Sequence, residues 1–351
     1  MTSGELPKIR YAVVGLGHIA QKAVLPAFAN TAYSQLTALV SGSVDKLHGV
    51  SQDYDVKHCW HYDDFDRCLS SGKVDAIFIA LPNTLHREYA IRALNKGIHV
   101  LCEKPLEMTT HACQEMIDAA DANNCKLMTA YRLYFEEANL LSQAMLQEKK
   151  IGEPRFFTSI FCYQVKPDNC RTIAKLGGGP LFDIGVYCVN AARNLFQDEP
   201  TEVMAMMESG EDDERFSEVE EMFSVTMRFP RNRLAQFICS LGAAPVVRYQ
   251  VVGSKGNLIL EDAYGYSMDK VQKVSVDGAE TETETFEKTD QFAAQIDYFS
   301  ACILADKQPK PSGLEGLKDV RIMEAIAESA EKGRAVKITP YVKSETVEKT
   351  G

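Results

Sequence analysis

The chain has 351 residues, of which 45% are hydrophobic, and a formal net charge of −11 at pH 7. This length favours two domains, and the acidic balance argues against nucleic-acid binding as the main function. No apolar run approaches the length of a membrane span, and the N-terminus lacks the pattern of a secretory signal. Because ten scattered cysteines form no C-x-x-C pair, we expect reduced thiols, a cytoplasmic location and no metal site.

The first part of the chain alternates strand-like runs with helix-length segments. The runs are rich in Val, Ile and Leu: IRYAVVGLG, QLTALVSGS, VDAIFIALP, GIHVLCEKP and CKLMTAYR. Strands that alternate with helices predict a parallel sheet with helices on both faces. We therefore predict an α/β domain over residues 1–130.

The second part of the chain has strands with short polar connections. Its strand-like runs are EPRFFTSIFCYQV, TEVMAMMES, EEMFSVTMRFP, RLAQFICSLG, RYQVVGSKGNLILE, VQKVSVDG and, last, RAVKIT. Helices are expected near 177–196, 290–307 and 314–333, and the acidic segment 208–221 is expected to be a solvated loop. The pattern predicts an α+β domain over residues 131–351, with a mostly antiparallel sheet.

A glycine-containing turn follows the first strand. Gly15 and Gly17 come directly after it, and Ala20 stands where a third glycine could be. Such a turn lets the backbone approach a pyrophosphate at the start of a helix. We therefore predict a Rossmann domain whose turn, with His18 and Ile19, holds a dinucleotide.

The end of the second strand indicates which dinucleotide is bound. An NAD site usually has Asp or Glu there, but this strand runs into Ser41 and Ser43, and Lys46 follows. Two hydroxyls and an ammonium suit a 2′-phosphate, which a carboxylate would repel. Asp45 fits this reading if it points to solvent, and an ordinary polar turn is the alternative. The sequence favours NADP over NAD.

Residues 79–109, IALPNTLHREYAIRALNKGIHVLCEKPLEMT, resemble the signature region of the glucose–fructose oxidoreductase and inositol dehydrogenase family, also called Gfo/Idh/MocA. The resemblance extends over nearly the whole chain, and it implies that residues 131–351 form a substrate-binding and oligomerisation domain with an open sheet. It implies that Lys104 of the E-K-P triplet reaches both nicotinamide and substrate. It also implies a set of cofactor contacts on the neighbouring loops and strands: Leu81, Asn83, His86, Glu103 and Arg132. Independently, Lys104 follows a parallel strand, at the edge where open α/β sheets bind ligands.

The segment 177–196, GGGPLFDIGVYCVNAARNLF, places Asp183, Tyr187 and Asn190 at helical spacings of four and three. Such side chains are expected on one face of a helix. Many family members have D-x-G-x-H-x-x-D here, whereas this chain has Tyr187 for the histidine and Asn190 for the last aspartate. No histidine follows residue 111 to replace it. The tyrosine version is similar to that of glucose–fructose oxidoreductase, related aldose enzymes and dihydrodiol dehydrogenases.

These residues suggest how a sugar could be oxidised. Oxidation of a carbinol removes its O–H proton as hydride leaves the carbon. We expect Tyr187 to take that proton, because the Lys104 ammonium favours the phenolate form. Asp183 would orient a sugar hydroxyl, although it could instead cap the helix. Arg171 resembles an arginine that faces the pocket in the family, and a surface position is the alternative.

The resulting hypothesis is NADP-dependent oxidation of an aldose of the glucose, xylose or galactose type at C1 to the lactone. The few residues before the first strand leave no arm of the kind that clasps a neighbour in glucose–fructose oxidoreductase, which favours a released cofactor. The alternatives are a sugar–sugar transhydrogenase with retained NADP, a dihydrodiol or other non-sugar dehydrogenase, and a non-catalytic NADP sensor. Because Phe223, Val225 and Met227 alternate as an uncovered sheet face would, we also expect a homodimer or homotetramer through the C-terminal sheet.

Overall fold

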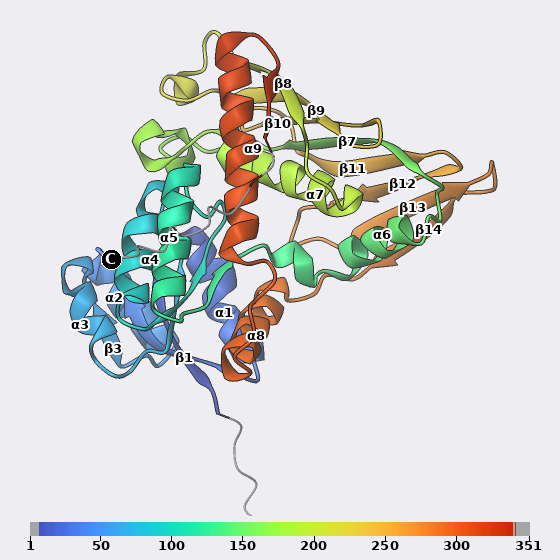
Figure 1. Cartoon of the computed structure of the whole chain (residues 1–351). Helices are drawn as coiled ribbons and strands as arrows, with labels where there is room; N and C mark the ends of the chain where they lie inside the picture. Colours follow the sequence, from blue (N-terminus) through green and yellow to red (C-terminus); the bar gives the residue numbers. More distant parts are fainter. Residues whose placement is uncertain (1–6, 340, 342–351) are drawn as a thin grey trace, which may run out of the picture.

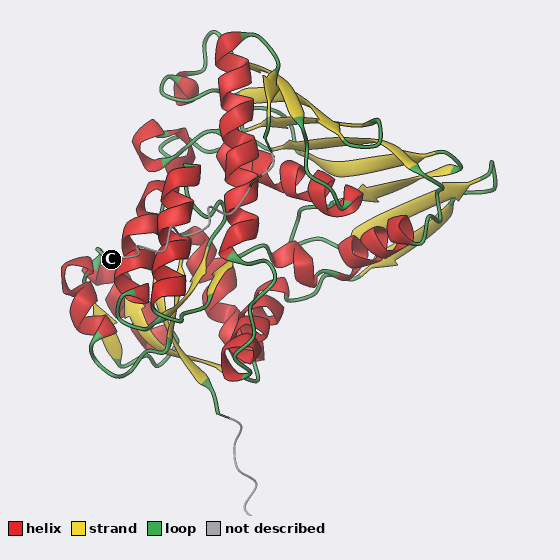
Figure 2. Cartoon of the chain, in the orientation of Figure 1, coloured by secondary structure: helices red, strands yellow, loops and turns green. Residues whose placement is uncertain are grey.

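The computed structural model describes residues 7–339 and 341, which form two sheets with helices around and between them (Figures 1 and 2). The N-terminal sheet has the strand order β3-β2-β1-β4-β5-β6, and its strands pair in parallel. Its strands are β1 (Ile9–Val14), β2 (Ser34–Val40), β3 (His58–Trp60), β4 (Ala76–Ile79), β5 (His99–Cys102) and β6 (Leu127–Thr129). This arrangement confirms the predicted parallel sheet. The edge strand β3 was not predicted, because its three residues form no apolar run.

Helices cover both faces of this sheet, as predicted. They are η1 (Ala20–Val24), α1 (Leu25–Ala27), α2 (Val44–Asp53), α3 (Phe65–Leu69), α4 (His86–Leu94) and α5 (Thr110–Ala122). Strand β4 is buried at every position, because helices α3 to α5 pack on one face and η1, α1 and α2 on the other. Burial on both faces explains its uninterrupted apolar sequence.

Helix α8 (Gln291–Leu304) follows the second sheet in the chain but packs on the first one (Figure 1). Its Ser300 hydroxyl lies 2.8 Å from the hydroxyl of Tyr11 in β1. Its Asp297 carboxylate accepts the backbone N–H groups of Ala32 and Tyr33, each at 2.8 Å. The C-terminal part of the chain therefore completes the core of the N-terminal sheet, and the boundary at residue 130 remains a prediction.

The C-terminal sheet has nine strands in the order β14-β13-β12-β11-β7-β10-β9-β8-β15. Strands β7 and β10 pair in parallel and the other neighbours antiparallel, which confirms a mostly antiparallel sheet. The strands are β7 (Pro154–Cys162), β8 (Glu202–Glu208), β9 (Met222–Phe229), β10 (Arg233–Ser240), β11 (Val246–Gly253), β12 (Gly256–Glu261), β13 (Lys270–Val276), β14 (Glu282–Phe286) and β15 (Val336–Lys337). Helices α6 (Glu137–Gln147), α7 (Val186–Phe196) and α9 (Gly313–Lys332) lie on one side of it (Figure 1). The polar strand β14 was not predicted.

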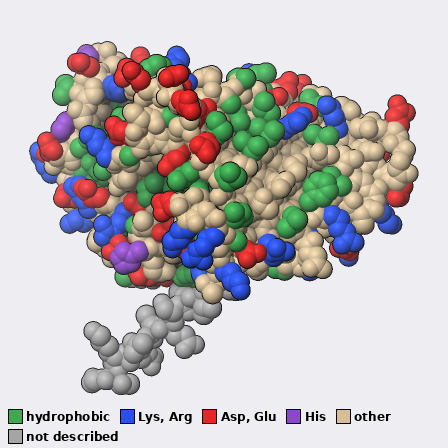
Figure 3. Space-filling model, turned by 90° about the horizontal axis from the view of Figure 1, so that it is seen from above, with side chains coloured by type: hydrophobic (Ala, Val, Ile, Leu, Met, Phe, Trp, Pro, Cys, Tyr) green, Lys and Arg blue, Asp and Glu red, His purple; other side chains and the backbone are tan. Residues whose placement is uncertain are grey.

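The face of this sheet opposite the helices carries exposed apolar side chains. Phe223, Val225 and Met227, which were expected there, are instead 3%, 2% and 0% exposed and belong to the core under the helices. Alternation along β9 predicts two faces but does not say which one the helices cover. The exposed large apolar residues on this face belong to β7, β8, β10 and the start of β11: Phe156, Met204, Met206, Leu234, Ile238 and Val246. The right-hand half of Figure 3, where this sheet lies, shows hydrophobic side chains at the surface.

Two further expectations concern the cysteines and the acidic segment. The ten cysteines are free thiols, and eight of them are buried, so they form no disulfide. The acidic segment 208–221 is not simply solvated, because Phe216 and Val219 are buried and Arg215 donates a hydrogen bond of 2.5 Å to the Val165 carbonyl. In the described part of the chain, no helix is long and apolar enough to cross a membrane.

Candidate active site

The three glycines before α7 allow a loop to lie against the N-terminal domain. A Cβ on Gly178 would lie 2.5 Å from the Arg171 carbonyl oxygen, and Gly177 has a positive φ of +75°. Asn83 donates a hydrogen bond of 2.8 Å from Nδ2 to the Gly177 carbonyl. Side chains are therefore excluded where the loop folds back on itself and meets the cofactor domain.

The glycines lead into a π-helical turn, η8 (Leu181–Gly185), that continues directly into α7. Such turns are rare and are often found at functional sites. Asp183 lies within the turn, and no side chain caps its start at Pro180. The alternative reading of Asp183 as a helix cap is therefore wrong.

Asp183 is held by three polar side chains. Arg171 Nε lies 2.7 Å and the Tyr163 hydroxyl 2.8 Å from Oδ2, and Lys104 Nζ lies 3.4 Å from Oδ1. Burial raises the pKa of this carboxyl, but the cations Arg171 and Lys104 and the hydrogen bonds outweigh it and bring the pKa well below its usual range. Asp183 is therefore a carboxylate at neutral pH. Arg171 is therefore paired with Asp183, although its side chain is 37% exposed.

Lys104 lies in the turn after β5, next to a cis peptide bond to Pro105. Its Nζ donates a hydrogen bond of 2.6 Å to the Asp183 carbonyl and lies 4.8 Å from the centre of the Tyr187 ring. The side chain is 11% exposed. The three residues predicted for catalysis thus form one cluster at the carboxyl end of a parallel strand, where open α/β sheets bind ligands.

Arg132 lies on the other side of Tyr187. It begins η5 (Arg132–Phe135), and its Nη2 donates to the Tyr187 hydroxyl at 3.3 Å and to the Tyr264 carbonyl at 2.5 Å. Its Nη1 donates to Gln291 Oε1 at 2.5 Å. Arg132 was expected to contact the cofactor, but in the described structure its guanidinium is directed to Tyr187.

The turn after β1 fits a dinucleotide pyrophosphate. Gly15 has a φ of +95°, and a Cβ there would lie 2.4 Å from the Ala80 carbonyl oxygen. At Gly17 a Cβ would meet no atom within 4 Å, so the backbone is open at the start of the following helix. His18 is exposed and Ile19 half-buried beside it. Glycine is required at the first position and leaves room for phosphate at the second.

The loop after β2 fits a 2′-phosphate. Ser43 accepts a hydrogen bond of 3.3 Å from Lys46 N and so caps α2, while Ser41 Oγ accepts one of 3.2 Å from Ser43 N. The Lys46 and Asp45 side chains are exposed in the first turn of α2. His61 Nε2 lies 3.2 Å from the Gly42 carbonyl, a neighbour that was not predicted. Because no carboxylate ends β2 itself, the loop suits an anionic group.

His86 does not line the cofactor site, which corrects the expectation for this residue. Its side chain is fully buried, with Nδ1 3.0 Å from the Pro105 carbonyl and Nε2 3.0 Å from the Leu81 carbonyl. Burial lowers the pKa of the imidazole, although hydrogen bonds to these carbonyls oppose the shift. His86 therefore ties the Leu81 loop to the turn after Lys104. Glu103, in that turn, is half-buried, and burial raises its pKa against the effect of Lys104 and Arg132.

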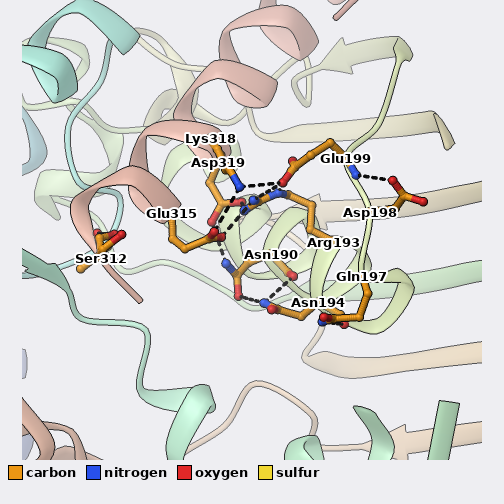
Figure 4. Close-up of polar contacts among 11 residues, drawn as sticks. Asn190, Arg193, Asn194, Gln197, Asp198, Glu199, Ser312, Glu315, Lys318 and Asp319 are labelled. Atoms are coloured by element: carbon orange, nitrogen blue, oxygen red, sulfur yellow. Dashed lines mark hydrogen bonds and ion pairs between the residues drawn. The ribbon is translucent and has the colours of Figure 1, made fainter. Parts of the chain in front are cut away.

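Asn190 does not contact Asp183 or Tyr187, although it was expected on one face with them; its side chain is bonded to α9 instead. Its Nδ2 donates a hydrogen bond of 2.7 Å to Asp319 of α9 (Figure 4). Arg193 lies 2.6 Å from Asp319 and also binds Glu199 and Glu315. This buried polar cluster fixes α7 to α9 and holds the active-site helix from behind.

The comparisons with known proteins agree with this geometry. Residues 9–131 match the Gfo/Idh/MocA family model described as "Oxidoreductase family, NAD-binding Rossmann fold". Residues 140–259 match the model of the Gfo/Idh/MocA C-terminal domain. The chain belongs to the Gfo/Idh/MocA oxidoreductase family. It is 30% identical to a D-xylose 1-dehydrogenase [NADP(+)] from Haloarcula marismortui over 338 residues, 94% of this chain and 93% of the relative.

Solved structures of Gfo/Idh/MocA-like enzymes are also similar. An aldose–aldose oxidoreductase from Caulobacter crescentus, complexed with glycerol, matches with 35% identity and a TM-score of 0.90, covering 94% of this chain and 100% of the other. A 3-ketoreductase from Actinomadura kijaniata, in complex with TDP-benzene and NADP, matches with 26% identity and a TM-score of 0.84, covering 92% and 98%.

Sequence reasoning missed several contacts in this Gfo/Idh/MocA site. Tyr163 near the end of β7 and Gln291 at the start of α8 were not singled out, although both contact predicted residues. Tyr163 comes directly after a strand, and nothing in the sequence around it distinguishes it from other aromatic residues. Gln291 lies far from the other site residues in the sequence. The helix expected near residues 290–307 contains Gln291, but nothing in its pattern indicated that this side chain would reach Arg132.

Proposed function

We propose that this chain oxidises an aldose at C1 to the lactone, with NADP as hydride acceptor and Tyr187 as the group that takes the hydroxyl proton. The convergence of Lys104, Asp183 and Tyr187 at the carboxyl end of β5 carries the proposal. That edge of a parallel sheet is where a dinucleotide binds. Tyr187 and the charged side chains of Lys104 and Asp183 therefore lie next to the expected position of the hydride acceptor.

Tyr187, Asp183 and Lys104 have different roles in the proposed reaction. The hydride leaves C1 with its electron pair for the nicotinamide, and the C1 hydroxyl loses its proton to the Tyr187 oxygen, so that a C=O bond forms. Asp183 is a carboxylate that can accept a hydrogen bond from a sugar hydroxyl. Lys104 Nζ, near Asp183 and above the Tyr187 ring, orients the substrate oxygen.

An aromatic wall beside Tyr187 suits a sugar ring. The Phe161 ring lies 5.7 Å from that of Tyr187 and stacks at 5.2 Å on Tyr264. Packed aromatic rings give a rigid apolar surface, against which the C–H face of a sugar can lie while its hydroxyls meet Asp183 and Arg171. This arrangement supports a polyol substrate with one apolar face.

NADP as the cofactor is supported by the NADP-dependent xylose dehydrogenase relative and by the NADP-bound ketoreductase structure. The loop of Ser41, Ser43 and Lys46 supports it from within this chain, because it offers hydroxyls and a cation. A carboxylate that would favour NAD is missing from the end of β2, residues 34–40.

A sugar–sugar transhydrogenase is the second candidate, favoured by the 35% identity to an aldose–aldose oxidoreductase. Such an enzyme would keep NADP bound while one sugar is oxidised and another reduced. The absorbance spectrum of the purified protein distinguishes the two. A nucleotide band that survives gel filtration supports the transhydrogenase, and a cofactor-free protein supports the dehydrogenase.

We further propose a homodimer or homotetramer through the open face of the C-terminal sheet. Six large apolar side chains there are 38% to 64% exposed, and exposed patches of this kind are typical of association surfaces. Light scattering of wild type and of Ile238→Lys tests this, and we expect a smaller mass for the variant.

The experiment that tests the proposed reaction is a rate measurement with a panel of sugars. Glucose, xylose, galactose and arabinose are each mixed with NADP or NAD, and formation of the reduced cofactor is followed by its absorbance. We expect turnover with at least one aldose and a preference for NADP. If no aldose reacts while NADP binds, the aldose proposal is wrong, and a trans-dihydrodiol substrate is tested next.

A further inference from the structure

We propose that Arg132 is the positioning residue that prepares Tyr187 for proton transfer, by donating a hydrogen bond to its oxygen and stabilising the phenolate. The inference rests on the proposed function, in which Tyr187 exchanges the proton. It assigns to Arg132 the role that the sequence had suggested for Lys104.

The geometry separates the two cations that flank Tyr187. Both cations lie over the ring, since the Arg132 guanidinium carbon is 5.2 Å from its centre, but Arg132 Nη2 also lies 3.3 Å from the Tyr187 oxygen, within hydrogen-bond distance. Lys104 Nζ lies 4.8 Å from the ring centre, and its hydrogen bonds go to the carbonyl and carboxylate of Asp183. A charged donor on the oxygen itself stabilises negative charge there more strongly than a cation over the ring face.

Arg132 is fixed in this position from several sides. Its side chain is 5% exposed, and its other N–H groups donate to the Tyr264 carbonyl and to Gln291 Oε1, each at 2.5 Å. The rings of Tyr266 and Phe292 lie 5.3 and 5.9 Å from the guanidinium carbon. Because the guanidinium is already immobilised, little conformational entropy is lost when it supports a phenolate.

The hydrogen bond also decides where the tyrosine proton points. A guanidinium has donors and no acceptor, so the Tyr187 oxygen accepts from Arg132 and its own O–H must point elsewhere. Within residues 7–339 and 341, the Tyr187 hydroxyl has no other hydrogen-bond partner. Its proton is therefore left for a ligand.

The charged and titratable groups around Tyr187 come from four segments. These are the turn after β5 with Lys104 and Glu103, η5 with Arg132, the stretch between β7 and α7 with Tyr163, Arg171 and Asp183, and the turn after β12 with Tyr264. Arg171 is paired with Asp183 at 2.7 Å. Arg132 is the cation bonded to the reacting oxygen.

In the forward direction the step is balanced as follows. The phenolate of Tyr187 takes the proton of the C1 hydroxyl as C1–H leaves as hydride for the nicotinamide, and the C1–O bond becomes a C=O bond. The neutral tyrosine later returns the proton to solvent, and Arg132 again holds the phenolate. In the reverse direction the same O–H donates to the carbonyl oxygen.

The test measures the ionisation of Tyr187 directly, without turnover. Protein labelled with ¹³C at the tyrosine Cζ is titrated by NMR, and the Tyr187 signal is assigned by its loss in Tyr187→Phe. We expect Arg132→Gln to raise the pH midpoint of this signal measurably, because the variant removes the charged donor to the Tyr187 oxygen. The matched control is Arg171→Gln, which removes a neighbouring cation that is bonded to Asp183 and not to Tyr187. We expect a smaller rise of the midpoint for this variant.

A second variant covers the case in which Arg132→Gln does not fold. Gln291→Glu keeps Arg132 in place but puts a carboxylate on its Nη1, and we expect it also to raise the midpoint. The proposal is overturned if the midpoint stays at the wild-type value in these variants, or if Lys104→Met raises it more than Arg132→Gln does. The proposed function fails by a different result, namely full sugar oxidation by Tyr187→Phe.

Discussion

Asp183→Asn is expected to lower both stability and activity, because it keeps the shape of the side chain and removes its charge. In the native structure the side chains of Asp183 and Lys104 are 12% and 11% exposed, whereas the side chain of Arg171 is 37% exposed. Loss of one partner from a buried ion pair typically costs about 3–5 kcal/mol. Because Arg171 can regain some hydration, we expect the lower end, about 3 kcal/mol of unfolding free energy.

The assay is denaturant unfolding followed by circular dichroism and extrapolated to water. The control is Asp64→Asn, since Asp64 pairs with an exposed Arg67, and such surface pairs contribute at most about 1 kcal/mol. The folded pKa of Asp183 lies below its usual value, so its stabilising effect is present above the unfolded pKa of about 3.9 and is lost as pH falls further. The difference between wild type and Asp183→Asn should therefore shrink below about pH 4. Equal stability of the two proteins at neutral pH would refute this reasoning.

Two further substitutions test the loops around the site. Gly178→Ala places a Cβ 2.5 Å from the Arg171 carbonyl oxygen, so we expect a loss of about 1–3 kcal/mol in unfolding free energy and a raised KM for sugar. Gly49→Ala, where a Cβ meets nothing within 4 Å inside a helix, should instead be neutral or stabilising by up to about 1 kcal/mol. Ser43→Asp can still cap α2, but its carboxylate should raise the Kd for NADP about tenfold or more relative to that for NAD, measured by fluorescence titration.

Much of the fold followed from local patterns. Uninterrupted apolar runs predicted the buried strands β1, β4 and β5, and alternating segments predicted β7 to β10. The packing of α8 on the first sheet depended on contacts such as Tyr11 with Ser300, which are 289 residues apart in the chain. No local pattern reports such a contact, so the return of the chain to its first domain was not foreseen.

The candidate site was predicted unevenly for a similar reason. Lys104, Asp183 and Tyr187 belong to motifs with fixed spacing, and the structure brings them together. The surroundings of His86 and Asn190 were not predicted, because the burial of an imidazole and a bond to α9 depend on tertiary packing.

Arg132 shows the limit of prediction from a motif most clearly. The run CKLMTAYR, which ends with Arg132, places this residue after β6. The direction of its guanidinium depends on the carbonyl of Tyr264 and the side-chain amide of Gln291. These partners come from segments more than a hundred residues away in the sequence. The residue could therefore be located from the sequence, whereas its contact with Tyr187 required the structure.

Tyr187 is the proposed proton-transfer group in NADP-dependent sugar oxidation. The most direct test compares kcat of wild type and Tyr187→Phe with the best aldose at saturating NADP, with the Kd for NADP measured on both proteins. We predict that kcat falls about 10²- to 10⁴-fold while NADP binding is unchanged, since the substitution keeps the ring and removes only its hydroxyl. A Phe variant that keeps the wild-type kcat would contradict the account.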